Sequence, residues 1–224
     1  MSEVFSMPRR TLLGGAAAFA AAPLLIEPHA AAAPSADASF RAVHRFHVGS
    51  MRVSIIDDAR FTFPAPAFAA NQPEGSIEPF LGRFGLPTDF ASLHMQVTLI
   101  ETGAHKVLLD TGMGDVTFPG NEPDNGRLLA GLAAMGLAPD DITDVILSHG
   151  HPDHIGSCSK NGAPVFKNAT YFIAPDELEY WSQKPGTEEN FANFMLAVGN
   201  QQLEPVRGLI KPYKDGDEIV PGIT

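Results

Sequence analysis

The densest run of metal-binding side chains in the sequence lies about two thirds of the way along it. Three histidines and one aspartate fall within six residues, at His149, His151, Asp153 and His154. They directly follow the apolar residues 145–147, a run long enough for one buried strand. Imidazole nitrogens and carboxylate oxygens are the ligands that Zn²⁺ and neighbouring divalent metals prefer. The sequence therefore predicts a metal site at the end of a strand.

The spacing of these four residues predicts two metal ions rather than one. His149 and His151, two residues apart, can turn the same way at a strand end and bind one ion. Asp153 and His154 come on the next turn of the chain and can face a second ion. Two ions about 3.5–4 Å apart can share a hydroxide, which is the arrangement used by many hydrolytic enzymes.

Elsewhere the apolar pattern predicts strands first, and then strands that alternate with helices. We expect strands at residues 46–48, 51–56, 93–101, 106–110, 145–147, 170–173 and 218–220. We expect helices at residues 128–135, 175–181 and 191–198. Residues 62–88 contain five prolines and are expected to form a long surface loop.

The motif His149-x-His151-x-Asp153-His154 resembles the signature of the metallo-β-lactamase superfamily. The segment from Val107 to Gly112, which ends in Asp-Thr-Gly, resembles the family's preceding strand. Three further segments resemble the branch that holds the secreted methyl parathion hydrolases and lactonase-like enzymes. They are residues 144–149, 176–181 and 216–223.

The resemblance implies an α+β fold, a four-layer αββα sandwich with a dinuclear zinc site at a sheet edge. His149 and His151 would bind the first ion, and Asp153 and His154 the second. Asp153 would also handle a proton or the leaving group. A metal-bridging hydroxide would attack a carbonyl or phosphoryl centre. Asp110 would hydrogen-bond to the metal loop and orient it, although capping the turn at residues 111–112 is equally compatible with its position.

The same resemblance implies further metal ligands outside the motif. A third histidine for the first ion, a bridging aspartate and another histidine for the second are expected C-terminal to Thr224. Within residues 34–224, four other histidines lie upstream of the motif without ligand spacing and are expected to be ordinary surface or core residues: His44, His47, His94 and His105. Residues 34–224 are therefore expected to be mainly the N-terminal half of the sandwich. We expect this piece to be poorly stable and inactive alone.

Other side chains near the motif admit two interpretations. Phe118, Trp181 and Phe194 fall near loops that border the site in relatives, so they either line an apolar pocket or belong to the core. Cys158, the only cysteine, is expected to be a buried small side chain rather than a ligand.

The first 33 residues have the layout of an export signal. A polar leader ends in Arg9-Arg10, a weakly apolar run of 16 residues follows, and small residues offer a cleavage site. The adjacent arginines resemble a twin-arginine signal. The apolar run is shorter than the roughly 20 residues of a spanning helix, so we expect a periplasmic or secreted protein without stable membrane insertion.

Composition narrows the partners, and the motif leaves several functions open. With 15 Lys and Arg against 26 Asp and Glu, a nucleic-acid partner is disfavoured. We expect a small-molecule substrate with a neutral ester-type bond, either a lactone or an organophosphate triester. The alternatives are a truncated, non-catalytic metal-binding fragment and a di-iron oxygen or nitric oxide reductase domain. A homo-oligomer, or a second polypeptide that completes the site, also stays open.

Overall fold

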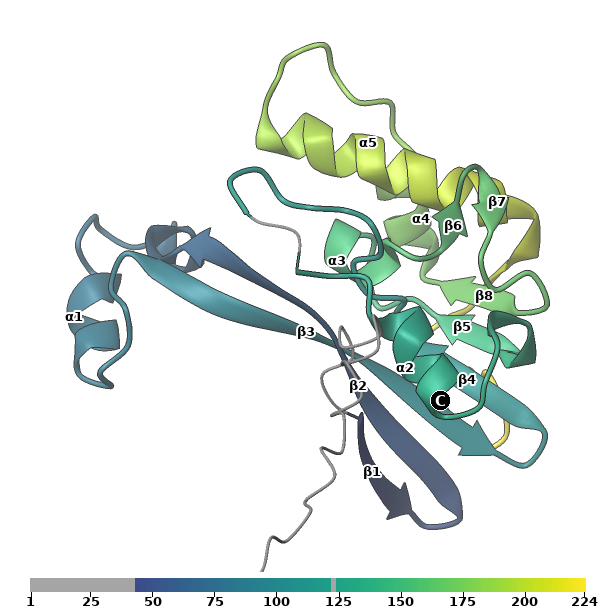
Figure 1. The fold of residues 1–224 in the computed structure, drawn as a ribbon. Helices are drawn as coiled ribbons and strands as arrows, with labels where there is room; N and C mark the ends of the chain where they lie inside the picture. The colour runs from purple at the N-terminus through teal and green to yellow at the C-terminus, as the bar shows by residue number, and fades with distance from the viewer. Residues whose placement is uncertain (1–42, 122–123) are drawn as a thin grey trace, which may run out of the picture. The chain divides into compact units, whose positions relative to one another are not determined.

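The computed structural model describes residues 43–121 and 124–224. The predicted export signal lies outside these residues. The described chain forms one seven-stranded mixed sheet in the order β1-β2-β3-β4-β5-β8-β9, and a two-stranded sheet of β6 and β7 (Figure 1). Among the described residues, no helix is long and apolar enough to cross a membrane.

Two antiparallel hairpins form the first half of the large sheet. β1 (Val43–Val48) pairs with β2 (Met51–Pro64) across the predicted turn at Gly49, where the positive φ of 59° suits glycine. β3 (Phe90–Thr102) then pairs with β2 and, on its other side, with β4 (His105–Leu109). Both hairpins confirm the prediction from sequence.

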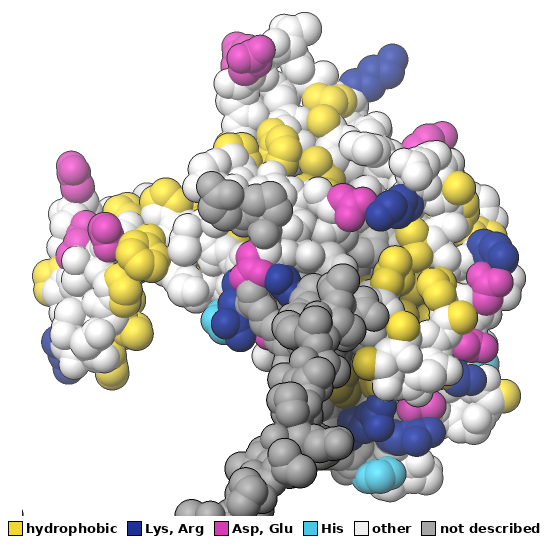
Figure 2. Space-filling view, viewed as in Figure 1, with side chains coloured by type: hydrophobic (Ala, Val, Ile, Leu, Met, Phe, Trp, Pro, Cys, Tyr) yellow, Lys and Arg dark blue, Asp and Glu magenta, His cyan; other side chains and the backbone are white. Residues whose placement is uncertain are grey.

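The long ends of β2 and β3 form an arm that carries two short helices (Figure 1). The 3-10 helix η1 (Ala65–Ala69) and helix α1 (Ile77–Gly82) occupy the segment that was expected to be a loop. That prediction is wrong because proline is compatible with the ends of elements: Pro66 is the second residue of η1 and Pro79 lies in the first turn of α1. Apolar side chains are exposed on this arm (Figure 2). Phe80 and Phe84 are among the exposed apolar residues of this segment.

A bulge in β2 turns Asp58 toward the protein interior. The register of β2 against β3 shifts between Asp57 and Ala59. The buried Asp58 carboxylate accepts hydrogen bonds from the backbone amides of Met113 (2.7 Å) and Leu128 (2.8 Å). This carboxylate therefore ties the loop that follows β4 to the start of the next helix.

The second half of the sheet is parallel. β4, β5 (Asp144–Ile146), β8 (Thr170–Ile173) and β9 (Ile210–Pro212) run in the same direction. The connections between them contain α2 (Leu128–Ala134), the 3-10 helix η2 (Pro139–Asp141), α3 (Pro152–Ile155), β6 (Ser159–Lys160), β7 (Ala163–Pro164), α4 (Pro175–Trp181), α5 (Phe191–Leu203) and the 3-10 helix η3 (Glu204–Leu209).

One predicted strand is wrong. Residues 218–220 form only an isolated bridge between Val220 and Ile223, and the last strand of the sheet is β9 instead. β9 lies next to β8, which offers an open parallel edge, whereas residues 218–220 pair with no strand of the sheet. The predicted helices at 128–135, 175–181 and 191–198 are confirmed as α2, α4 and α5.

A single apolar core joins the sheet to its helices. Leu99, Leu108 and Val145 are fully buried in the central strands. Leu128 of α2 and Leu203 of α5 belong to the same cluster. Because the sheet is covered in this way, the carboxyl ends of its parallel strands are held in fixed positions, and these ends carry the candidate site.

Candidate metal centre

Three segments that are distant in sequence meet at the carboxyl edge of the parallel strands. β4 leads into Asp110, β5 leads into the loop that begins at Ser148, and β8 leads into α4. In a parallel sheet such ends lie at the same edge, which is where ligands bind in open α/β sheets. The loop of residues 148–154, hereafter the metal loop, therefore has Asp110 on one side and α4 on the other.

The four predicted ligands come together as two pairs. The Nε2 atom of His149 lies 2.9 Å from the Nδ1 atom of His151. The Nε2 atom of His154 lies 3.5 Å from the Oδ2 atom of Asp153. His151 is the last residue before α3, while Asp153 and His154 lie within it. The two pairs are adjacent, since the ring centroids of His149 and His154 lie 4.0 Å apart.

Asp110 orients the second pair by a hydrogen bond to His154. Its backbone has a φ of 62°, a conformation that aspartate and asparagine adopt more readily than most residues. Its carboxylate accepts hydrogen bonds from the Ser148 amide (2.7 Å), the Ser148 hydroxyl (2.9 Å) and Nδ1 of His154 (2.8 Å). In the neutral His154 ring, donation through Nδ1 leaves Nε2 unprotonated, and Nε2 is the atom that faces Asp153.

The same network reaches His149. The Ser148 hydroxyl lies 2.9 Å from Nδ1 of His149 while donating its hydrogen to Asp110. The hydroxyl oxygen can therefore accept from Nδ1 of His149, which leaves Nε2 free to face His151. Asp110 thus orients one histidine directly and a second through Ser148, rather than capping its own turn.

Helix α4 supports the first pair. The Oε2 atom of Glu177 accepts hydrogen bonds from Nε1 of Trp181 (2.8 Å) and from the backbone amide of Gly150 (3.2 Å). The rings of Trp181 and His151 meet edge to face, with centroids 5.1 Å apart and an interplanar angle of 76°. Neither Glu177 nor Ser148 was identified from the sequence as part of the site. The four-residue spacing of Glu177 and Trp181 on one predicted helix was the available signal.

The local environment favours neutral rings in the first pair. Burial lowers the pKa of His149 and of His151, and the neighbouring His154 adds to the effect in both. Burial alone would also lower the pKa of His154, but the hydrogen bond to Asp110 and the charges of Asp153 and Asp110 raise it above its ordinary value. Neutral imidazole is the form that binds metal.

The donor set fits divalent metal ions bound as two pairs. Two ligand atoms that each lie about 2.0–2.1 Å from a tetrahedral zinc are about 3.3 Å apart. The measured separations of 2.9 Å and 3.5 Å lie on either side of that value. In the described part of the chain no group of three or more histidine, cysteine or acidic side chains is arranged to hold one ion. Each pair of described residues would supply two ligands to an ion.

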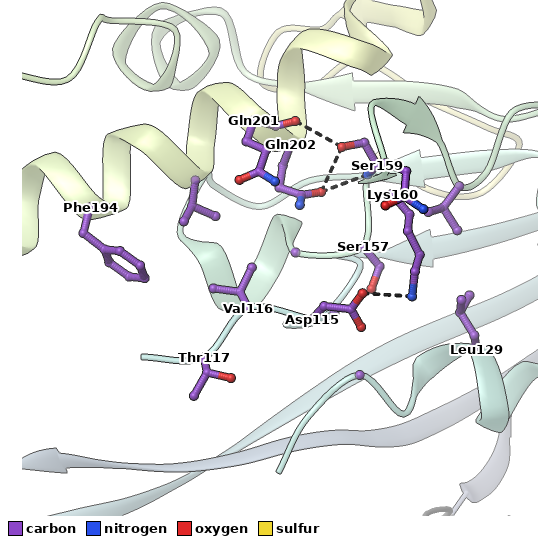
Figure 3. A pocket seen from close by; sticks show the side chains of 16 residues that line it. Asp115, Val116, Thr117, Leu129, Ser157, Ser159, Lys160, Phe194, Gln201 and Gln202 are labelled. Carbon is purple, nitrogen blue, oxygen red and sulfur yellow. Dashed lines mark hydrogen bonds and ion pairs between the residues drawn. The ribbon is translucent and has the colours of Figure 1, made fainter. Parts of the chain in front are cut away.

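The three aromatic residues considered for a pocket have different surroundings. Phe118 is buried in the core among Phe61, Phe63 and Phe194. Trp181 borders the metal loop through His151. Only Phe194 of the three lines the cavity of about 340 Å³ shown in Figure 3.

That cavity is separate from the metal ligands. It lies beyond the carboxyl end of α3, against Ser157, Lys160 and Gln202, and none of the four predicted ligands lines it (Figure 3). An ion pair between Lys160 and Asp115 spans part of its wall.

The remaining candidates lie outside the metal loop. Cys158 is fully buried beside the Thr111 hydroxyl (3.5 Å), and burial raises the pKa of its thiol to about 12. His105 pairs with Asp144 (2.8 Å) on the opposite end of β5 from the metal loop. His44 and His47 lie on β1, and His94 lies on β3.

Part of the chain is similar to known proteins. Residues 96–185 match the model of the family described as the metallo-beta-lactamase superfamily. A probable metallo-hydrolase of Methanocaldococcus jannaschii is 37% identical over 67 residues, which is 30% of this chain and 27% of that protein. The N-acyl homoserine lactonase AttM of Azorhizobium caulinodans is 36% identical over 69 residues, or 31% and 24% of the two chains.

The fold is shared with a solved lactonase structure. AidC, a dizinc quorum-quenching lactonase in complex with a homoserine product, superposes with a TM-score of 0.70 at 23% identity. The match covers 82% of this chain and 65% of AidC. This chain therefore spans less than two thirds of AidC, and its matches span less than a third of each of these two curated relatives.

The described residues have the metallo-β-lactamase fold, an α+β architecture built on a mixed sheet. More particularly, the stretch that matches the metallo-beta-lactamase superfamily model, residues 96–185, includes Asp110, the metal loop and α4.

Proposed function

We propose that this chain carries the metal loop of an exported, metal-dependent hydrolase that opens lactone rings. The observation that carries the proposal is the convergence of two ligand pairs at one sheet edge, each held by a carboxylate from another segment. The match to the lactonase AttM supports a lactone as the substrate. The organophosphate triester is the alternative that the same chemistry allows.

His149 and His151 would hold one divalent ion, and Asp153 and His154 the second, with zinc as the metal that suits these donors best. Two such ions, when bound, supply Lewis acidity and lower the pKa of water. The two further histidines and the bridging aspartate that the resemblance implies stay a prediction.

The chain's own residues have defined tasks in this proposal. Asp110 and Ser148 keep His154 and His149 in the tautomers that leave Nε2 free. Asp153 directs Oδ2 toward His154. In lactone hydrolysis water adds to the carbonyl carbon and gives up one proton, the ring C–O bond breaks, and the departing ring oxygen takes up one proton. In this proposal the Asp153 carboxylate accepts the proton from water and returns it to the ring oxygen.

The test is a metal measurement followed by an assay. About two zinc ions per chain by elemental analysis, lost in Asp153→Ala and His151→Ala, would support the two-ion site. Turnover of an N-acyl homoserine lactone, in excess of turnover of a phosphotriester, would support the substrate class. Zinc binding without any turnover would instead favour the non-catalytic fragment, and the absence of zinc would overturn the proposal.

The cellular location belongs to the same proposal. The arginine pair and short apolar run of residues 1–33 support export through the twin-arginine route to the periplasm. Replacing Arg9 and Arg10 by lysine should retain the protein in the cytoplasm. Unchanged export of that variant would argue against the twin-arginine route.

A further inference from the structure

Glu177 touches the metal loop without being a candidate ligand. It lies in the first turn of α4, 27 residues beyond Gly150 in sequence. Its Oε2 atom accepts two hydrogen bonds, one from the indole of Trp181 and one from the backbone amide of Gly150. Its other carboxylate oxygen makes no hydrogen bond within the described chain. One oxygen atom thus joins helix α4 to the backbone between the two histidines of the first pair.

The indole that Glu177 holds packs directly on this backbone. A Cβ atom added to Gly150 would lie 2.3 Å from Cδ1 and Cγ of Trp181. Such a distance is far below van der Waals contact, so only glycine fits between the metal loop and the indole. The same indole meets the His151 ring edge to face. The position of Trp181 therefore limits where the ring of His151 and the backbone at Gly150 can go.

We infer that Glu177 is a positioning residue, which fixes the His149–His151 pair by holding Trp181 and the Gly150 amide in place. This inference rests on the proposed function, since it concerns the geometry of the proposed metal site. Residues that orient metal ligands by hydrogen bonds typically contribute about 10–100-fold to metal affinity. We expect removal of the Glu177 side chain to weaken metal binding by a factor in that range.

The hydrogen bonds can be separated from the charge by substitution. Because both donors contact the same oxygen, the single carbonyl oxygen of glutamine can replace it. Glu177→Gln should therefore bind metal within about threefold of the wild type, whereas Glu177→Ala should show the full loss. Glu179→Ala is the matched control, since Glu179 is an exposed acid on the same helix without a hydrogen bond or ion pair in the described chain.

The chain contains a built-in reporter of this contact. Trp181 is its only tryptophan, so the intrinsic emission comes from the indole that Glu177 holds. In the metal-free protein, Glu177→Ala should shift this emission to longer wavelength and increase its quenching by acrylamide. Glu177→Gln and Glu179→Ala should leave both unchanged. This readout requires neither metal nor turnover.

The decisive experiment titrates the metal-free full chain and its three variants with Co²⁺. Quenching of Trp181 emission and the visible absorption of bound Co²⁺ would give the affinity for each protein. Weaker binding in Glu177→Ala, with wild-type behaviour in Glu177→Gln and Glu179→Ala, would support the inference. Equal affinities of the wild type and Glu177→Ala would overturn it while leaving the proposed metal site intact. A wild-type chain that binds no Co²⁺ would overturn the proposed function itself.

Discussion

The two ligand pairs of the metal loop are supported by different chemistry. The pair of Asp153 and His154 is supported by Asp110. The Asp110 carboxylate accepts three hydrogen bonds and fixes the tautomer of His154. The pair of His149 and His151 is supported by α4. There Glu177 accepts two hydrogen bonds from neutral groups, and the indole of Trp181 packs on the metal loop. One side acts mainly through polar contacts at a strand end, and the other acts mainly through packing.

The protonation of the two pairs reflects this difference. The pKa of His154 is raised, because the Asp110 hydrogen bond and nearby carboxylates outweigh its burial. The pKa values of His149 and His151 are lowered by burial and by the neighbouring histidine. Substitutions on the Asp110 side should therefore affect stability and protonation together, whereas substitutions on the α4 side should act chiefly through geometry.

The largest effect should come from Asp110→Ala. This change leaves the Ser148 amide, the Ser148 hydroxyl and the His154 ring without their acceptor, and it places alanine at a positive φ. We expect a loss of about 3 kcal/mol in the free energy of unfolding, measured by urea denaturation. Asp115→Ala, which removes an exposed ion pair with Lys160 on the same loop, should cost under about 0.5 kcal/mol.

Asp110→Asn sharpens this prediction. Asparagine tolerates the backbone conformation, so most of the stability should be retained. Its amide nitrogen would face Nδ1 of His154 as a donor and favour the tautomer with hydrogen on Nε2. We expect about 10–100-fold weaker metal binding in a folded protein. Wild-type affinity in Asp110→Asn would show that Asp110 does not set the tautomer.

A smaller effect is expected from Gly150→Ala on the other side of the loop. The added methyl group would overlap the indole of Trp181, and overpacking of this kind costs about 1–3 kcal/mol. The emission of Trp181 should change with it. Gly208→Ala is the control, because Gly208 has open space around it and no positive φ. Equal melting temperatures for the two variants would argue against close packing at Gly150.

The smallest difference expected between variants concerns the reactivity of Cys158, which lies on the Asp110 side. Burial raises the pKa of its thiol to about 12, the hydrogen bond from Thr111 opposes the rise, and the charge of Asp110 adds to it. Because only the thiolate reacts, alkylation of the folded protein at about pH 8 should be at least 100-fold slower than in the unfolded chain, and should accelerate as the pH rises toward that pKa.

The same measurement compares the two sides directly. Asp110→Asn removes a charge that acts on Cys158, so it should speed alkylation a few-fold, whereas Glu177→Gln should not change it. Mass spectrometry of iodoacetamide-treated protein gives both rates. Faster alkylation in Glu177→Gln would show that the two sides of the metal loop are coupled.

Local patterns predicted most elements of the fold. The apolar runs and turn residues located both hairpins and the helices α2, α4 and α5. They failed where long-range pairing decides the outcome. Residues 218–220 have the composition of a strand, yet residues 210–212 pair with the free edge of β8 instead. Proline content suggested a loop at residues 62–88, yet β2 continued to Pro64 because β3 pairs with it along that length.

The sequence by itself determined which atoms can bind metal and in what order, because His149, His151, Asp153 and His154 fall within six residues and their grouping is local. Only the tertiary structure decided what holds them. Asp110 reaches Ser148 across 38 residues, and Glu177 reaches Gly150 across 27. Both contacts exist because β4, β5 and β8 align in parallel and bring their carboxyl ends to one edge, and no short-range pattern encodes which strands become neighbours.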